Sequence, residues 1–298
     1  MTHYRTVDVF AAAAFLGNPL AVIPDARALK PDDFQRIARE FNYSETTFVL
    51  PPESPENHAR VRIFTPNEEM PFAGHPNVGT AYVLGRIGTL FGKPVPDAMR
   101  FEEIAGVVSV ALMRSAGEVS GAAVRAPRAL ETAAERSAAD VAALAGIAPS
   151  HVLSLAHLPL YAAVGAGFLF AEVTPDALAQ AAPDTAAFHA EAARLAAEGA
   201  SATLPALFLW AREGMTGAAL ALEARMFAPL SGISEDPATG SAAAALGALL
   251  ARRNVAQSLA IRQGVRMGRP SQIGVEARPD GIWISGRCVP QFAGQLSW

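Results

Sequence analysis

The sequence predicts an α+β protein with two similar halves, each a sheet curled around one buried helix. Three observations lead to this fold class. The turn Gly74–Ala81, GHPNVGTA, recurs as Glu235–Ala242, EDPATGSA. The offset between the two copies is constant, since 236 − 75 and 240 − 79 both equal 161. Each copy is followed by an almost wholly apolar helical segment, and a helix that is apolar on every side must be buried on every side.

The composition allows a large core and excludes several classes of protein. Hydrophobic residues make up 51% of the 298 residues, charged residues make up 17%, and the formal net charge is −4. Nucleic acids and anionic membranes both attract a basic surface, so neither is expected as a partner. No apolar run is long enough to span a bilayer, and Asp8 and Asn18 interrupt the apolar N-terminal stretch, which we interpret as folded protein rather than a signal peptide. The single cysteine, Cys288, can form no internal disulfide, and the expected compartment is the cytoplasm.

The first half is expected to alternate short strands with two helices. Turn residues at 17–19 separate the predicted strands 6–10 and 20–23. Segment 29–42 has one apolar face and a proline near its start, which favours a helix. Segment 44–50 is extended and rich in Thr, Phe and Val, so Glu45 lies where a helix gives way to a strand. The remaining elements of this half are a strand at 59–66, a buried helix within the segment 75–88 that begins near Gly79, and strands at 99–106, 107–113 and 121–127.

The second half repeats this order of elements. Pro127 marks the boundary, which gives domains of residues 1–126 and 127–298, with the last strand able to pack back on the first half. A strand ends at Phe64–Pro66 in one half and at Phe227–Pro229 in the other, and each is followed by a polar loop and then by the repeated turn. Helices are predicted over 131–147 and 183–199, and strands at 158–173, 206–213, 220–229, 259–264, 271–277 and 281–290.

The repeated turn has the chemistry of an anion site. The first N–H groups of a helix have no carbonyl partner within the helix and attract negative charge. Gly74, Gly79 and Gly240 leave room for a ligand near the backbone, and Ser241 adds a hydroxyl. Two such helix starts facing one cleft would bind a small carboxylate and bring His75 and Asp236 to it as acid–base groups.

Simpler interpretations of the same residues remain open. A helix start with Gly and Pro is often only a capped helix, and a histidine beside it is often only a hydrogen-bonded structural residue. Glu45, at a helix–strand junction, fits a solvated or capping role equally well, and Glu68 and Glu69 before the first turn are expected to be solvated. The repetition of the whole turn, each time with an ionisable residue, puts the functional interpretation on an equal footing with the structural one.

Six segments in register resemble the PhzF-like phenazine-biosynthesis family, which belongs to the diaminopimelate-epimerase-like superfamily. They are FLGNPLAV, NYSETTFV, RIFTPNEEMPFAGHPNVGTA, SEDPATGSA, RQGVRMGRPSQI and SGRCVPQFAG, and they extend from near residue 7 to near residue 294. The resemblance implies two pseudo-symmetric domains, each a β-barrel-like sheet around a central helix. Other members of the superfamily use a cysteine from each domain, but here Gly74 stands at the first position and no cysteine at the second. We expect Cys288 to be a buried small hydrophobic residue.

The resemblance also implies a cofactor-free isomerase that moves a proton within a small carboxylate-bearing substrate. It assigns the central acid–base role to Glu45 of the SETTF motif, with His75 and Asp236 beside it, and substrate binding to Asn18, Gly74, Gly240 and Ser241. No metal and no cofactor are expected, and the implied assembly is a homodimer. Two alternatives stay open: a lyase or dehydratase using the same glutamate, and a small-carboxylate binding protein without catalysis.

Overall fold

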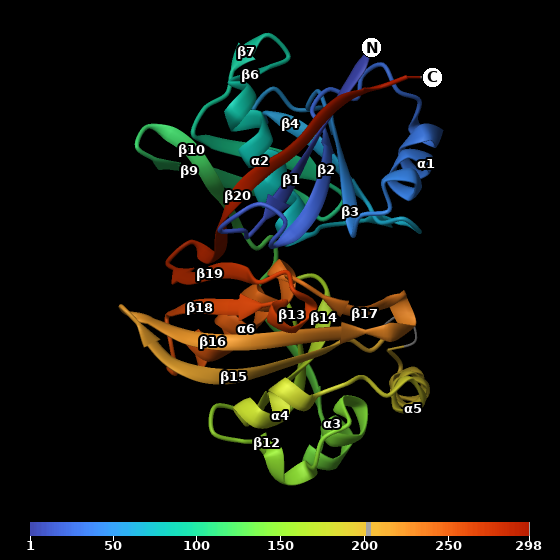
Figure 1. Ribbon diagram of the computed structural model, residues 1–298, viewed down its shortest axis with the longest axis vertical. Helices are drawn as coiled ribbons and strands as arrows, with labels where there is room; N and C mark the ends of the chain where they lie inside the picture. Colours follow the sequence, from blue (N-terminus) through green and yellow to red (C-terminus); the bar gives the residue numbers. More distant parts are fainter. Residues whose placement is uncertain (201–203, 298) are drawn as a thin grey trace. The chain divides into compact units, whose positions relative to one another are not determined.

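The computed structural model describes residues 1–200 and 204–297. Its chain divides into two compact units, Met1–Pro127 together with Trp283–Trp298, and Arg128–Ile282 (Figure 1). No helix in these described residues is long and apolar enough to cross a membrane.

Eight strands of the first unit close into a barrel. Each strand pairs with the next in the order β1, β2, β3, β4, β8, β9, β10 and β20, and β20 returns to pair with β1. The bounds are β1 Thr2–Val9, β2 Asn18–Ile23, β3 Glu45–Leu50, β4 Ala59–Phe64, β8 Ala98–Glu103, β9 Gly106–Ser115, β10 Glu118–Arg125 and β20 Gly281–Leu296. The short strand β5 (Glu69–Met70) pairs antiparallel with the end of β4, and β6 (Thr89–Leu90) pairs with β7 (Lys93–Pro94).

Helix α2 (Gly74–Ile87) runs through this barrel, and its residues from Gly74 to Leu84 are all buried (Figure 1). A Cβ atom on Gly79 would come 2.5 Å from Leu20 and 2.7 Å from Val9, so this glycine lets the helix approach β1 and β2. Helix α1 (Pro31–Phe41) packs outside the barrel, where Phe34 stacks on Phe48 with ring centroids 4.4 Å apart.

The second unit repeats this pairing pattern. In the first unit, β2 and β3 are parallel, β3 and β4 antiparallel, and β4 and β8 parallel. In the second unit, β14 and β15 are likewise parallel, β15 and β16 antiparallel, and β16 and β18 parallel. Its strands are β11 Glu131–Glu135, β12 Val152–Leu153, β13 Leu160–Ala163, β14 Gly167–Val173, β15 Leu207–Thr216, β16 Ala219–Ala228, β17 Ile233–Asp236, β18 Ser258–Gln263 and β19 Ser271–Arg278. The curved sheet surrounds α6 (Gly240–Arg252), which contacts β13, β14, β18 and β19.

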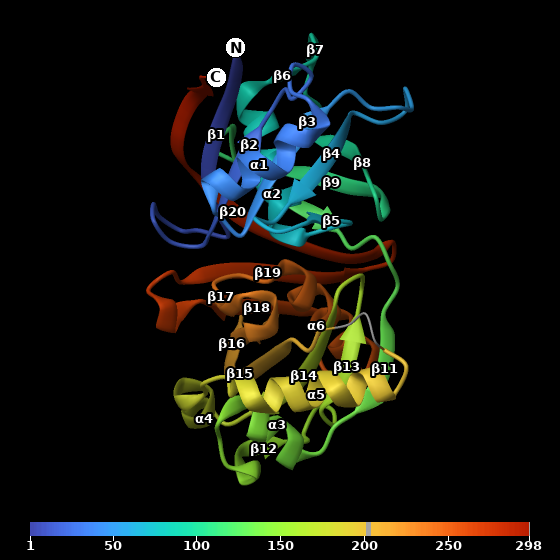
Figure 2. The same ribbon diagram turned by 90° about the vertical axis from the view of Figure 1, so that its right-hand side faces the viewer.

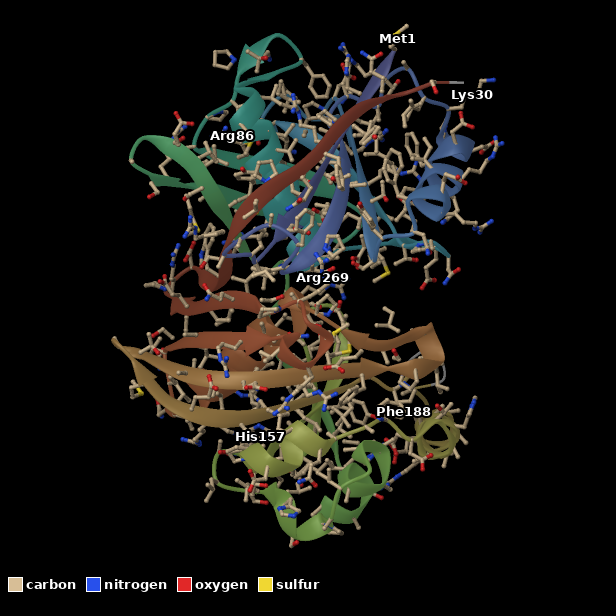
Figure 3. All side chains as sticks on the ribbon, in the orientation of Figure 1. Met1, Lys30, Arg86, His157, Phe188 and Arg269 are labelled. Carbon is tan, nitrogen blue, oxygen red and sulfur yellow. The ribbon has the colours of Figure 1, made fainter. Side chains whose placement is uncertain are left out.

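Three outer helices cover the other face of this sheet: α3 (Ala138–Ala145), α4 (Pro175–Gln180) and α5 (Thr185–Ala197) (Figure 2). Phe188 of α5 is fully buried in the apolar cluster that these helices share with β14, β15 and β16 (Figure 3). The predicted fold class, two barrel-like sheets each around a central helix, is therefore confirmed.

Two element predictions were wrong in part. The first central helix begins at Gly74 rather than near Gly79, so His75 and Pro76 lie in its first turn. Proline is tolerated there because the N–H it lacks would have no partner within the helix. Residues 131–135 form strand β11, paired with β13, instead of extending the helix that follows them. Cross-strand pairing here outweighs the helical propensity of alanine and glutamate.

Candidate active site

The first unit brings three of the predicted site residues together. Asn18 is the first residue of β2, Glu45 is the first residue of β3, and the two strands are parallel neighbours, with Leu20 opposite Glu45. His75 lies in the first turn of α2, and its Nε2 is 3.3 Å from Oε2 of Glu45. Ser44 connects the two strands, because its hydroxyl donates to Oδ1 of Asn18 at 2.7 Å.

His75 is held as a neutral imidazole. Burial lowers the pKa of His75 to about 3, even though a hydrogen bond to the backbone of Pro19 opposes this shift. Proline offers only a carbonyl, so the imidazole N–H donates to it and the remaining ring nitrogen faces Glu45. A neutral ring nitrogen 3.3 Å from a carboxyl oxygen places an acceptor, and no positive charge, beside Glu45.

The second unit builds a different polar cluster at the corresponding place. Asp236 ends β17 and is only 8% exposed, and α6 begins four residues later at Gly240. The Thr239 hydroxyl donates to Oδ2 of Asp236 at 2.6 Å. Gln263, at the end of β18, donates to the Asp236 carbonyl and to the Thr239 hydroxyl, both at 2.9 Å. Asp236 is thus fixed by its own turn and by a neighbouring strand.

The two helix starts place a glycine alike and differ in the residue after it. Gly74 and Gly240 are both buried at the first position of their helices, followed by the buried His75 in α2 and by the partly exposed Ser241 in α6. The prediction that Gly79 leaves room for a ligand is wrong, because the space beside its Cα is filled by Leu20 and Val9.

Sequence reasoning missed an ion pair that occurs in both units. Arg62 of β4 donates to both carboxyl oxygens of Glu69, at 2.6 and 2.7 Å, and the Glu69 side chain is 24% exposed rather than fully solvated. Arg225 of β16 binds Glu235 in the same forked way, with both contacts at 2.8 Å. Each guanidinium also lies over the phenylalanine two residues on, Phe64 at 5.0 Å and Phe227 at 4.8 Å. Because the two arginines stand at the same offset of 163 as Phe64 and Phe227, the repeat could have revealed them.

Gln263 was also missed, although it stands in the RQG segment that resembles the family. Its neighbour Gly264 explains part of that segment. Gly264 has φ +72, and a Cβ atom there would come 2.7 Å from the carbonyl oxygen of Pro237. The strand end therefore packs directly on the turn that carries Asp236.

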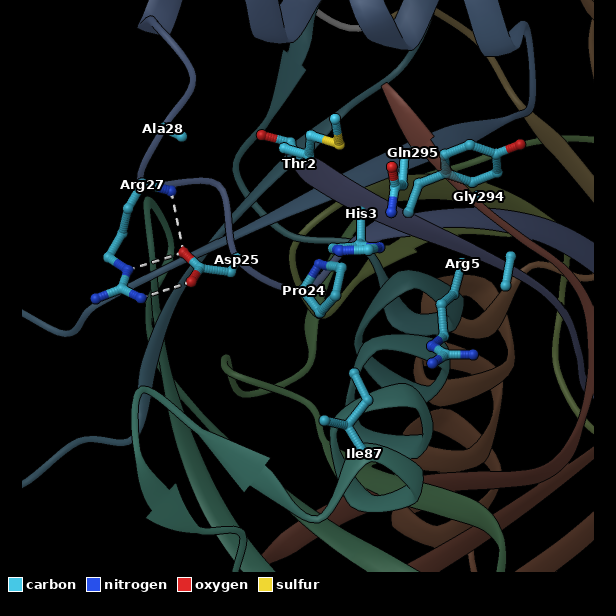
Figure 4. Close-up of a pocket in the computed structure, with 13 residues that line it drawn as sticks. Thr2, His3, Arg5, Pro24, Asp25, Arg27, Ala28, Ile87, Gly294 and Gln295 are labelled. Carbon is cyan, nitrogen blue, oxygen red and sulfur yellow. Dashed lines mark hydrogen bonds and ion pairs between the residues drawn. The ribbon is translucent and has the colours of Figure 1, made fainter. Parts of the chain in front are cut away.

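A separate surface pocket of the first unit lies where the start of β1 and the end of β20 run side by side (Figure 4). Arg27 on its rim is neutralised by Asp25, with contacts of 2.9 and 2.6 Å. None of the predicted site residues is among the residues that line it. Cys288 is a buried small residue, as expected, with 6% of its surface exposed. Burial raises the pKa of its thiol, which disfavours the reactive thiolate.

Two barrel-like units, each built around a central helix, define the diaminopimelate-epimerase-like fold class. A predicted epimerase from Pseudomonas aeruginosa superposes with a TM-score of 0.79 at 29% identity and covers 99% of both chains. A PhzF-family phenazine biosynthesis protein from Bacillus anthracis gives a TM-score of 0.83 at 22% identity, over 100% of this chain and 99% of its own, and shows the shared fold.

The profile of the PhzC-PhzF family, phenazine biosynthesis-like protein, matches residues 7–294, and the chain belongs to this family. It is 36% identical to an uncharacterized isomerase of Mesorhizobium japonicum, over 99% of this chain and 98% of that one. It is 37% identical to the trans-2,3-dihydro-3-hydroxyanthranilate isomerase of Pseudomonas fluorescens, over 91% of this chain and 88% of that one. The protein is accordingly an isomerase, as the sequence predicted.

Proposed function

We propose that this isomerase moves a proton between two carbon atoms of a small carboxylate-bearing substrate, with Glu45 as the acid–base group. The observation that carries this proposal is the 3.3 Å separation of Glu45 Oε2 and His75 Nε2 at the amino end of a buried helix. Glu45 takes the proton from one carbon, the electron pair of that bond shifts along the conjugated system, and Glu45 delivers the proton to the receiving carbon. The product has the same atoms as the substrate, so no co-reactant is needed.

His75 suits this role because burial keeps it neutral across the physiological pH range. A neutral imidazole accepts a hydrogen bond from protonated Glu45 and places no positive charge beside its ionised form. It therefore holds the carboxyl group in place without lowering its basicity as a cation would.

We further propose that the second unit binds a carboxylate at the start of α6, through the Gly240 N–H and the Ser241 hydroxyl, with Asp236 beside it as an acid–base group. Support comes from the repeat, which gives each unit a helix start and an acid–base group at an offset of 161. The amino end of a helix of 13 residues is a suitable anion site.

As substrate we propose trans-2,3-dihydro-3-hydroxyanthranilate, the compound that names the activity of the Pseudomonas fluorescens relative, or a close hydroxy or amino acid analogue. Incubation of the full-length protein with this compound in D₂O, followed by NMR and mass spectrometry, tests the proposal. We expect an isomer of unchanged composition that carries deuterium at the receiving carbon, because the partly exposed Glu45 carboxyl group exchanges its proton with D₂O before it delivers it.

The decisive variant is Glu45→Gln, which should lower turnover by about 10²–10⁴-fold. Glu68→Gln is the matched control, because Glu68 is exposed and its hydrogen bonds to Thr65 are made by its backbone N–H and carbonyl, which the substitution keeps. Undiminished turnover in Glu45→Gln would overturn the acid–base role, and a product that has lost water would replace the isomerase with a lyase.

A further inference from the structure

Glu103 is a carboxyl group on the inner face of the first barrel. Alternate residues of a strand point to the same face, and Met99 and Phe101 of β8 are 2% and 0% exposed. Glu103 ends the strand on that same inner face. Both of its carboxyl oxygens are shielded from solvent, and neither has a hydrogen-bond partner of good geometry within residues 1–200 and 204–297.

The second unit has a glutamine at the corresponding position. Gln263 ends β18 after Leu259 and Ile261, which are 3% and 1% exposed, and β18 pairs with β16 as β8 pairs with β4. Its side-chain amide forms three hydrogen bonds with the turn before α6. Nε2 donates to the Asp236 carbonyl and to the Thr239 hydroxyl, and Oε1 accepts from the Thr239 N–H at 3.1 Å. A neutral side chain that both donates and accepts therefore holds the amino end of the central helix.

In the first unit the neighbouring polar group is Asn77, in the first turn of α2. Its Nδ2 donates to the Ala73 carbonyl at 3.0 Å, while its buried Oδ1 has no partner among the described residues. An ionised carboxylate only accepts hydrogen bonds, whereas a carboxylic acid also donates one. Burial raises the pKa of Glu103 well above its usual range, and hydrogen bonding by Asn77 opposes this only in part.

We propose that Glu103 is a neutral carboxylic acid whose O–H donates to Oδ1 of Asn77, and that it thereby positions the first turn of α2, which carries His75. The bond satisfies two buried groups at once and makes Glu103 the counterpart of Gln263. Glu103 is a positioning residue and does not touch the substrate. Its effect on catalysis rests on the proposed function, whereas its protonation state does not.

The charges around Glu103 have partners of their own. Arg62 of β4 is paired with Glu69 of β5, and Arg60 of β4 is paired with Glu53. On the outer face of β8, Glu102 accepts from the backbone N–H groups of Glu53 and Ser54, and β9 faces Glu103 with Gly106. Within the described part of the chain, no arginine, lysine or histidine forms an ion pair with Glu103, so none of these groups favours its ionised form by direct contact.

The first test measures the thermal midpoint of unfolding against pH for the full-length protein and for Glu103→Gln. A pKa raised in the folded state means that the unfolded chain releases the proton first, so stability falls as pH rises above about 4.3. We therefore expect Glu103→Gln to gain stability relative to the wild type as pH increases from 4 toward 8. An infrared carbonyl band of a protonated carboxylic acid should be present in the wild type and absent from the variant.

Glu102→Gln is the matched control, one residue away on the opposite face. Burial raises the pKa of Glu102, but hydrogen bonds from Asn57, Glu53 and Ser54 outweigh it and lower the pKa overall. This variant should lose stability relative to the wild type as pH rises, the opposite trend. If Glu103→Gln instead loses stability with rising pH, or if its midpoint follows the wild type at every pH, Glu103 is ionised and the proposal is overturned.

The second test measures kcat. Glu103→Ala removes the proposed donor to Oδ1 of Asn77 and should lower kcat by about 5- to 100-fold, with rescue in Glu103→Gln. Equal losses in both variants would overturn the positioning role even where the pH trend holds. If the wild-type protein is inactive on the proposed substrate, only the proposed function is contradicted. The unfolding and infrared measurements need no substrate and still test the protonation state of Glu103.

Discussion

Nε2 of His75 lies 3.3 Å from Oε2 of Glu45, and this contact joins the first turn of α2 to the first residue of β3. The imidazole is 4% exposed and its other nitrogen is turned to the Pro19 carbonyl. The His75 ring is therefore shielded from water and stays neutral, while the Glu45 side chain beside it is 15% exposed.

The pH dependence of His75 follows from its burial. Its pKa falls from 6.5 to about 3 in the folded protein, so the unfolded chain binds the proton first as pH decreases. Stability is then lost progressively below pH 6.5, and each pKa unit corresponds to about 1.4 kcal/mol. We expect the His75 ring signals in NMR to stay unchanged between pH 8 and pH 5, with His75→Gln identifying them. A titration near pH 6.5 would contradict a buried neutral ring.

Thr239 should orient Asp236. Its hydroxyl donates to Oδ2 of Asp236 at 2.6 Å and accepts from Gln263. Removal of a hydrogen bond to a charged group costs about 1.5–3 kcal/mol, so Thr239→Val should lower kcat by about 10- to 100-fold. Thr239→Ser keeps the hydroxyl and should retain most of the activity. Equal activity of the two variants would show that Asp236 needs no such support.

Gly79 should be required for packing rather than for ligand binding. A methyl group there would come 2.5 Å from a Leu20 methyl and 2.7 Å from a Val9 methyl. Gly79→Ala should destabilise the protein by about 1–3 kcal/mol in urea unfolding, because an overpacked core strains its neighbours. Gly167→Ala is the control, since nothing lies within 4 Å of the added atom. A stable Gly79→Ala that loses substrate binding would restore the ligand role.

Arg225 should stabilise the strand that carries Asp236. Its Nε and Nη2 donate to the two carboxyl oxygens of Glu235, both at 2.8 Å. Its Nη1 also donates to the carbonyls of Leu178 and Ala181, at 3.0 and 2.6 Å. Arg225→Lys keeps the charge but cannot reproduce the fork. We expect a loss of about 1–3 kcal/mol in thermal or urea unfolding. Arg278→Lys is the control, since Arg278 pairs with Glu276 at an exposed site. Equal losses would show that the forked geometry adds nothing.

Much of the fold could be predicted from local pattern. The apolar periodicity of 29–42 gave α1, the unbroken apolar character after each repeated turn gave α2 and α6, and the constant offset of 161 gave the duplication. The start of α2 was misplaced, because a proline within the first turn looks the same in the sequence as a proline before the helix. Strand β11 was missed because its partner β13 lies 25 residues away and local propensity carries no information about that pairing.

By itself, the sequence determined which residue types stand at the repeated turns, and hence that each half places an ionisable group at the amino end of an apolar helix. Tertiary structure alone decided that Glu45 meets His75, that Glu103 is enclosed beside Asn77, and that β20 completes the barrel begun by β1. The physical reason is that burial and hydrogen bonding depend on neighbours distant in the chain. A carboxyl group at the end of a strand has the same sequence pattern whether it faces solvent or the interior of a closed barrel. Ionisation is easy in the first setting and costly in the second.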